Sequence, residues 1–132
     1  MKLTAYALTA ALLAPSLSPD RLLASIAAKE GHRSTDLGGR YAIGRLTWVQ
    51  HTRMPYNLSA VSSYAEAVAA KHLNWLAQAL ADRGYQATPY NLAGAWHLGL
   101  EGFLRAGARC EYAEHVSNLY YSTHTTNALQ IR

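Results

Sequence analysis

The carboxylate that the sequence places best for chemistry is Glu30. It follows Leu22 and Ile26 at intervals of four residues, so it ends the apolar stripe of an amphipathic helix. Partial burial disfavours the charged form of a carboxyl group, and an acid held neutral at about pH 5 to 7 can protonate a leaving-group oxygen. The pattern makes Glu30 a candidate general acid. The alternative is a solvated glutamate at the unfavourable end of the helix dipole.

The other seven acidic residues have simpler expected positions in the chain. We expect helix-start residues at Asp20 and Glu66, a last-turn residue at Asp82, and exposed helical residues at Glu111 and Glu114. Asp36 and Glu101 are predicted to lie in loops. A second catalytic carboxylate, if the chemistry uses one, would therefore be Asp36 or Glu101.

The histidines and the cysteine argue against a metal centre. None of the six histidines forms an H-x-x-x-H pair, and Cys110 is the only cysteine, so neither a zinc pattern nor an internal disulfide is possible. We therefore expect no metal and no other cofactor. Cys110 is expected to pack as a small buried hydrophobe. Trp75 stands beside Leu76 on a predicted helix, and we expect it to pack in the core.

The elements that must hold these residues are helices. Ser18, Pro19 and Asp20 predict a helix start, and Gly31 predicts its end. Further helices are expected over about 64–83, opened by an S-x-x-E capping box at 63–66, from Thr88-Pro89 onward, around 102–106, and over about 110–121. We find no convincing strand. The sequence predicts one compact all-α domain over 18–122, followed by a polar C-terminal tail at 123–132.

The N-terminus resembles a secretory leader. Lys2 precedes the apolar run LTAYALTAALLA, which is too short to span a bilayer. We therefore expect residues 1–17 to be a signal peptide and the mature protein to be exported to the periplasm or the exterior. The alternative is an amphipathic or buried first helix.

The charge balance favours an anionic partner only mildly. Twelve Lys and Arg against eight Asp and Glu give a net charge of +4. An excess of this kind suits a cell wall, an acidic membrane surface or nucleic acid. The basic residues form no run, so we expect no nucleic-acid partner and no stable membrane span after leader removal.

Four segments, read in order, resemble the catalytic domain of the soluble lytic transglycosylases, a branch of the lysozyme-like superfamily. LLASIAAKEG is similar to the family's A-I-A-x-x-E-S helix end, RYAIGRLT to G-A-x-G-L-M-Q, AWHLGLEGF to A-Y-N-A-G-x-G-A-V, and EYAEHV to E-T-R-N-Y-V. Thr47 stands where the family has glutamine, His97 where it has asparagine, and His115 where it has tyrosine. The resemblance places Glu30 in the catalytic position and implies a substrate cleft lined by Tyr41, Gly44, Thr47, Trp96, His97 and His115.

The resemblance implies a lysozyme-like helical fold and cleavage of the MurNAc–GlcNAc bond of peptidoglycan. In this family one glutamate acts first as acid and then as base for the sugar's own 6-hydroxyl, so that a 1,6-anhydro product forms without water. That scheme needs one carboxylate, whereas most glycoside hydrolases use two. Three alternatives remain open: a hydrolytic lysozyme, an inactive peptidoglycan-binding or envelope-assembly module of the same fold, and a small basic helical domain with an unrelated partner.

Overall fold

The computed structural model describes the chain over residues 17–130, with side chains through residue 122, and this part is built from helices. The elements in chain order are α2 (Pro19–Glu30), η1 (Gly39–Tyr41), α3 (Arg45–His51), η2 (Tyr56–Ala60), α4 (Ser62–Asp82), α5 (Pro89–Leu98), α6 (Leu100–Arg105) and α7 (Glu111–Gln130). The predicted all-α class is confirmed. The predicted leader lies almost entirely outside the described residues.

Helix α2 begins and ends at the residues that the sequence predicts. The Ser18 side chain accepts a hydrogen bond from the backbone N–H of Arg21, and Pro19 occupies the first turn. Gly31 ends the helix in the left-handed conformation, with φ of 68°, which a residue without a Cβ adopts at little cost. These local signals fix where α2 stops, and they place Glu30 on its last turn.

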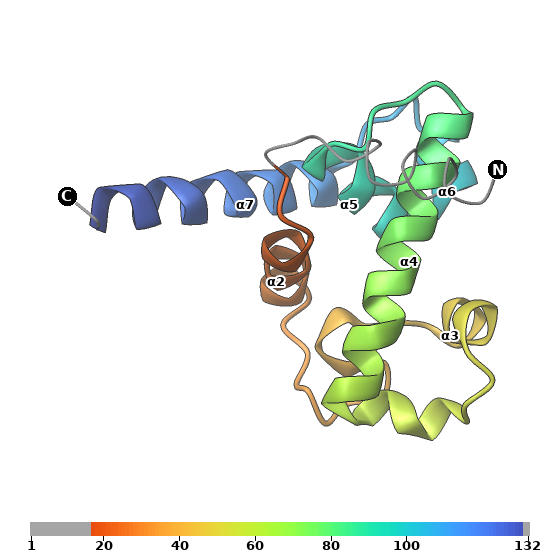
Figure 1. Cartoon of the computed structure of the whole chain (residues 1–132). Coiled ribbons are helices and arrows are strands. Elements are labelled where there is room, and N and C mark those ends of the chain that lie inside the picture. The colour runs from red at the N-terminus through yellow and green to blue at the C-terminus, as the bar shows by residue number, and fades with distance from the viewer. Residues whose placement is uncertain (1–16, 131–132) are drawn as a thin grey trace, which may run out of the picture.

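Long helix α4 is the axis on which the other elements pack. It contacts α2, α3, α5 and α6, while α7 lies against α5 and α2, as Figure 1 shows. Every α-helix contributes fully buried side chains to one core, among them Leu22, Ile26, Trp48, Leu73, Leu76, Leu80, Leu92, Phe103 and Val116. Because α2, α5 and α7 meet on this core, the end of α2, the end of α5 and the start of α7 come together in space.

The loop between α2 and α3 is held by specific polar contacts. Backbone N–H of Gly38 donates to the hydroxyl of the fully buried Ser59 over 2.7 Å. Gly38 has φ of 87°, and a Cβ there would lie 2.5 Å from the carbonyl oxygen of Ile43. The Tyr56 hydroxyl donates to that same carbonyl over 2.6 Å. The turn that resembles the family's second motif is thus a rigid part of the fold.

Three local predictions were wrong. The capping box at 63–66 does not open α4, because the helix already begins at Ser62 and shows no side-chain cap. Glu101 lies in the first turn of α6 and not in a loop. Helix α7 continues to Gln130 and includes most of the predicted tail.

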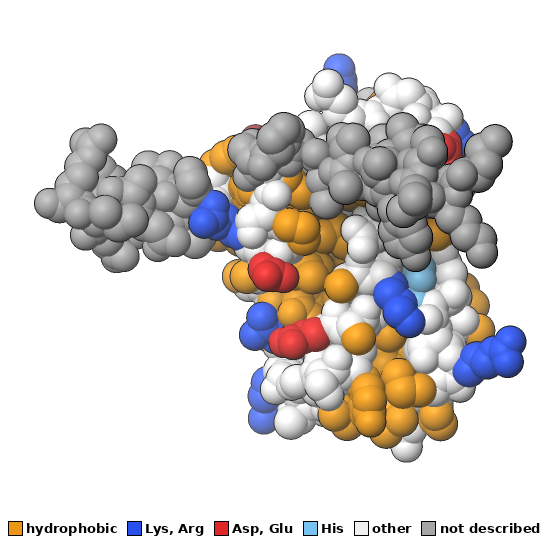
Figure 2. All heavy atoms as spheres, in the orientation of Figure 1, with side chains coloured by type: hydrophobic (Ala, Val, Ile, Leu, Met, Phe, Trp, Pro, Cys, Tyr) orange, Lys and Arg blue, Asp and Glu red, His pale blue; other side chains and the backbone are white. Residues whose placement is uncertain are grey.

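The surface carries no concentrated charge on the face that Figure 2 shows. Lys and Arg side chains are dispersed over it, which agrees with the absence of a basic run in the sequence. None of the helices in the described part has the length and apolar character that a membrane crossing requires.

Candidate functional site

Glu30 is held by a tyrosine from the other end of the chain. It is half-buried at the end of α2, and its Oε2 accepts a hydrogen bond of 2.7 Å from the hydroxyl of Tyr112 in the first turn of α7. Its Oε1 makes no hydrogen bond with any residue that the structure describes. One carboxylate oxygen is therefore fixed by a hydrogen bond within the described part of the chain, and the other is not.

Tyr112 is a permanent hydrogen-bond donor at this position. Only 8% of the residue is exposed. Burial, followed by the hydrogen bond to Glu30 and the charge of that carboxylate, raises the pKa of Tyr112 far above its ordinary value. The phenol consequently keeps its proton under all physiological conditions and orients the carboxyl group without competing for protons.

The ring of His97 stacks face to face on the ring of Tyr112. The two rings are parallel within 6°, with centroids 4.1 Å apart. His97, in the last turn of α5, is exposed, as is His115 on α7. Both line an open depression of about 610 Å³ together with Tyr112 and Lys29. We call Glu30, Tyr112 and His97 the Glu30 site.

The structure brings together only some of the predicted site residues. His97 and His115 share a depression with Tyr112, which bonds Glu30. Tyr41 is 3% exposed and belongs to the core, so it offers almost no surface to a substrate. Gly44 is the N-cap of α3, and Thr47 is half-buried within that helix.

Trp96 contacts a different group of side chains. Its ring centroid lies 5.1 Å from that of His72, which is itself hydrogen-bonded to His51 over 2.9 Å and stacked on Trp75. We call these four residues the His72 cluster. The sequence indicates this cluster only weakly. His72 interrupts the apolar stripe of α4 between Val68 and Leu76, so its position predicts burial but does not predict which residues it contacts.

The two other carboxylates considered for catalysis have partners elsewhere. Oδ2 of Asp36 accepts a hydrogen bond from the backbone N–H of Arg33 over 2.8 Å, which closes its own turn. Glu101 pairs with Arg83 and lines a second depression, which does not include Tyr112. Neither residue shares the depression beside Glu30. Within the described part of the chain, no three potential ligands gather as a metal site would require.

The His72 cluster should make stability depend on acid. Burial, and then the neighbouring His51, lower the pKa of His72 from 6.5 to about 4. Burial and Lys71 also lower the pKa of His51. The unfolded chain therefore binds more protons than the folded one between about pH 6.5 and 4, so stability is complete above this window and is lost as pH falls through it. We expect the thermal midpoint to decrease across that range.

The test is to measure how the thermal midpoint changes with pH in two variants and in the parent protein. His72→Gln should flatten the slope between about pH 6.5 and 4, because it removes the group that protonates on unfolding. His32→Gln removes an exposed histidine and should retain the slope of the parent. An undiminished slope in His72→Gln would contradict this account.

Comparisons with known proteins add no relative. A scan against protein-family models, a search of curated proteins and a search of solved structures each give no match for this chain. The residues and geometry of the Glu30 site and the order of the sequence motifs are therefore what indicates a function for this chain.

Proposed function

We propose that this protein is a lytic transglycosylase that cleaves the MurNAc–GlcNAc bond of peptidoglycan, with Glu30 as its acid and base. The observation that carries the proposal is the Glu30–Tyr112 hydrogen bond at the junction of α2 and α7. This hydrogen bond orients one oxygen of the half-buried Glu30 carboxyl group. Helix α2, which carries Glu30, has a sequence that resembles the family's catalytic helix. The resemblance of the N-terminus to a leader supports export to the compartment that holds this substrate.

The chemistry uses the two oxygens of Glu30 differently. With Oε2 accepting from Tyr112, the proton of the neutral acid lies on Oε1 and passes to the glycosidic oxygen as the C1–O bond breaks. Positive charge develops on the sugar, and the new carboxylate is stabilised by the Tyr112 hydroxyl. The carboxylate then takes the proton of the sugar's 6-hydroxyl, whose oxygen bonds to C1. Glu30 ends protonated, and no water is consumed.

The proposal predicts the mass of the product. Incubating the purified protein with peptidoglycan sacculi should release muropeptides with a 1,6-anhydro end, which are one water lighter than hydrolysed products. Asp36 and Glu101 have other partners and lie outside the depression beside Glu30, which Glu111 does line, so the water-free outcome rests on the resemblance to the transglycosylases. Mass spectrometry of the released fragments separates the two outcomes.

Three other results of that experiment would each contradict the proposal in a different way. Products with reducing ends alone would make the protein a hydrolase. Binding to sacculi without release would support the non-catalytic module of the same fold. No binding at all would indicate an unrelated partner.

A further inference from the structure

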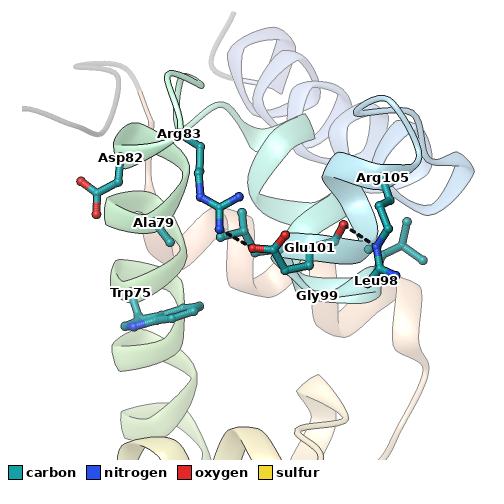
Figure 3. A pocket seen from close by; sticks show the side chains of 10 residues that line it. Trp75, Ala79, Asp82, Arg83, Leu98, Gly99, Glu101 and Arg105 are labelled. Atoms are coloured by element: carbon teal, nitrogen blue, oxygen red, sulfur yellow. Dashed lines mark hydrogen bonds and ion pairs between the residues drawn. The ribbon is translucent and has the colours of Figure 1, made fainter.

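A second depression shares one lining residue, Leu98, with the depression that Tyr112 and His97 line. It is open, has a volume of about 640 Å³, and is formed by the second half of α4, the junction between α5 and α6, and α6 itself. Its volume is within the range of small-molecule sites in proteins. Figure 3 shows Trp75 and Arg83 pointing from α4 toward α6 across this space.

Trp75 forms an aromatic wall of this depression. The residue is 45% exposed, in contrast to the predicted core position and to the fully buried Trp48. Its indole is parallel within 11° to the ring of His72, with centroids 6.0 Å apart. His72 is fixed in turn by its hydrogen bond to His51. The indole is therefore held in one orientation by the His72 cluster while nearly half of the residue contacts solvent.

The polar groups around Trp75 balance in charge. Two cations, Arg83 and Arg105, and two anions, Asp82 and Glu101, line the depression, and Asp82 points away from it in Figure 3. Arg83 is paired with Glu101, and Arg105 donates from Nε to the backbone carbonyl of Glu101 over 3.4 Å. An anionic ligand would have to displace Glu101 from Arg83, whereas an uncharged ligand with many hydroxyls can use the remaining donors and acceptors of both groups.

We propose that the Trp75 depression binds a pyranose ring of a glycan strand. The apolar C–H face of the sugar stacks on the exposed indole, and its hydroxyl groups bond to the Arg83–Glu101 pair and to Arg105. Leu98 lines both depressions, so one strand that occupies this subsite can extend into the depression that His97 and Tyr112 line. The assignment of that strand to peptidoglycan rests on the proposed function; the stacking of a sugar on Trp75 does not.

The test measures binding without cleavage. Full-length Glu30→Gln protein is titrated with the β-1,4-linked tetramer of N-acetylglucosamine by calorimetry. Adding Trp75→Ala should weaken binding about tenfold, because it removes the aromatic face. Adding Tyr64→Ala should leave the affinity unchanged, since Tyr64 lies on the same helix with a similar exposure of 41% but outside both depressions.

Two further variants keep the test decisive if Trp75→Ala folds poorly. Trp75→Phe should retain part of the affinity but lose the ligand-induced change in tryptophan fluorescence. Arg105→Ala alters an exposed residue at the rim and should weaken binding severalfold. Unchanged affinity in Trp75→Ala and Arg105→Ala, an equal loss in Tyr64→Ala, or no binding by the parent at millimolar ligand would each overturn the proposal.

The binding test of the Trp75 depression and the cleavage test of the proposed function can fail independently of each other. Trp75-dependent binding by a protein that releases nothing from sacculi would keep this subsite and reject the activity. Release of anhydromuropeptides by a protein whose Trp75→Ala variant binds the tetramer normally would keep the activity and reject the subsite.

Discussion

Glu30→Gln is expected to lower the release of muropeptides by a factor of about 100 to 10,000, which is the usual effect of removing a required proton donor. Glutamine has nearly the shape of glutamate but carries no transferable carboxyl proton. Its amide oxygen can still accept the hydrogen bond from Tyr112, so the contact between α2 and α7 is kept. The release rate from sacculi and the thermal midpoint, measured on the same preparation, separate loss of chemistry from loss of fold.

Two companion variants make that result interpretable. Tyr112→Phe deletes only the hydroxyl that orients Oε2, and we expect a smaller loss, about tenfold, from one hydrogen bond to a charged group. Glu114→Gln neutralises an exposed carboxylate on the same helix and should cleave at the parental rate. Full activity in Glu30→Gln, at unchanged stability, would exclude Glu30 from the mechanism.

The sequence predicted α2 well because the signals at its ends are local. A capping serine, a first-turn proline and a terminal glycine act through neighbouring backbone atoms, and all three function as predicted. The S-x-x-E motif at 63–66 failed for the converse reason. A capping side chain needs a non-helical backbone, but the chain leaves η2 and enters α4 at Ser62, so that Ser63 and Glu66 are already inside the helix.

The expected core position of Trp75 was wrong, because adjacency to a buried residue does not decide which face of a helix a side chain occupies. Leu73, Leu76 and Leu80 set the buried stripe of α4 at spacings of three and four residues. A residue one position before Leu76 is rotated by about 100° from it and leaves the stripe. The periodicity alone could have predicted an exposed indole. The depression it lines was not predictable, because α6 reaches α4 only through the tertiary fold.

The contact between Tyr112 and Glu30 was likewise not predictable from the sequence. The similarity of EYAEHV to the family's E-T-R-N-Y-V motif predicts a site residue at His115, where the family has tyrosine. His115 lies three residues after Tyr112 and therefore on the same face of α7. The two residues share a helix face, but which of them contacts Glu30 depends on how far along α7 the end of α2 meets it. That register is set by the packing of α2, α5 and α7 together.

Gly94→Ala is expected to destabilise the fold by about 2 to 3 kcal/mol, although alanine is the better helix former. Gly94 is buried in α5, where an added Cβ would lie 2.3 Å from Cε1 and 2.5 Å from Cδ1 of Phe103. Phe103 is fully buried in the core, so its ring has little room to move away. Because α5 carries His97 and α6 carries Glu101, this contact also fixes the spacing between the two depressions.

The matched control is Gly102→Ala on α6, where an added Cβ meets only the Cβ of Leu98 at an ordinary 3.5 Å. With space available in a helix, that substitution should be neutral or stabilise by up to about 1 kcal/mol. The two glycine-to-alanine changes are therefore expected to shift the denaturation midpoint in opposite directions. Phe103→Leu should relieve the clash, so the double variant Gly94→Ala/Phe103→Leu should lose less than the sum of the single losses. A stabilised Gly94→Ala, or strict additivity in the double variant, would show that the two helices do not depend on this close approach.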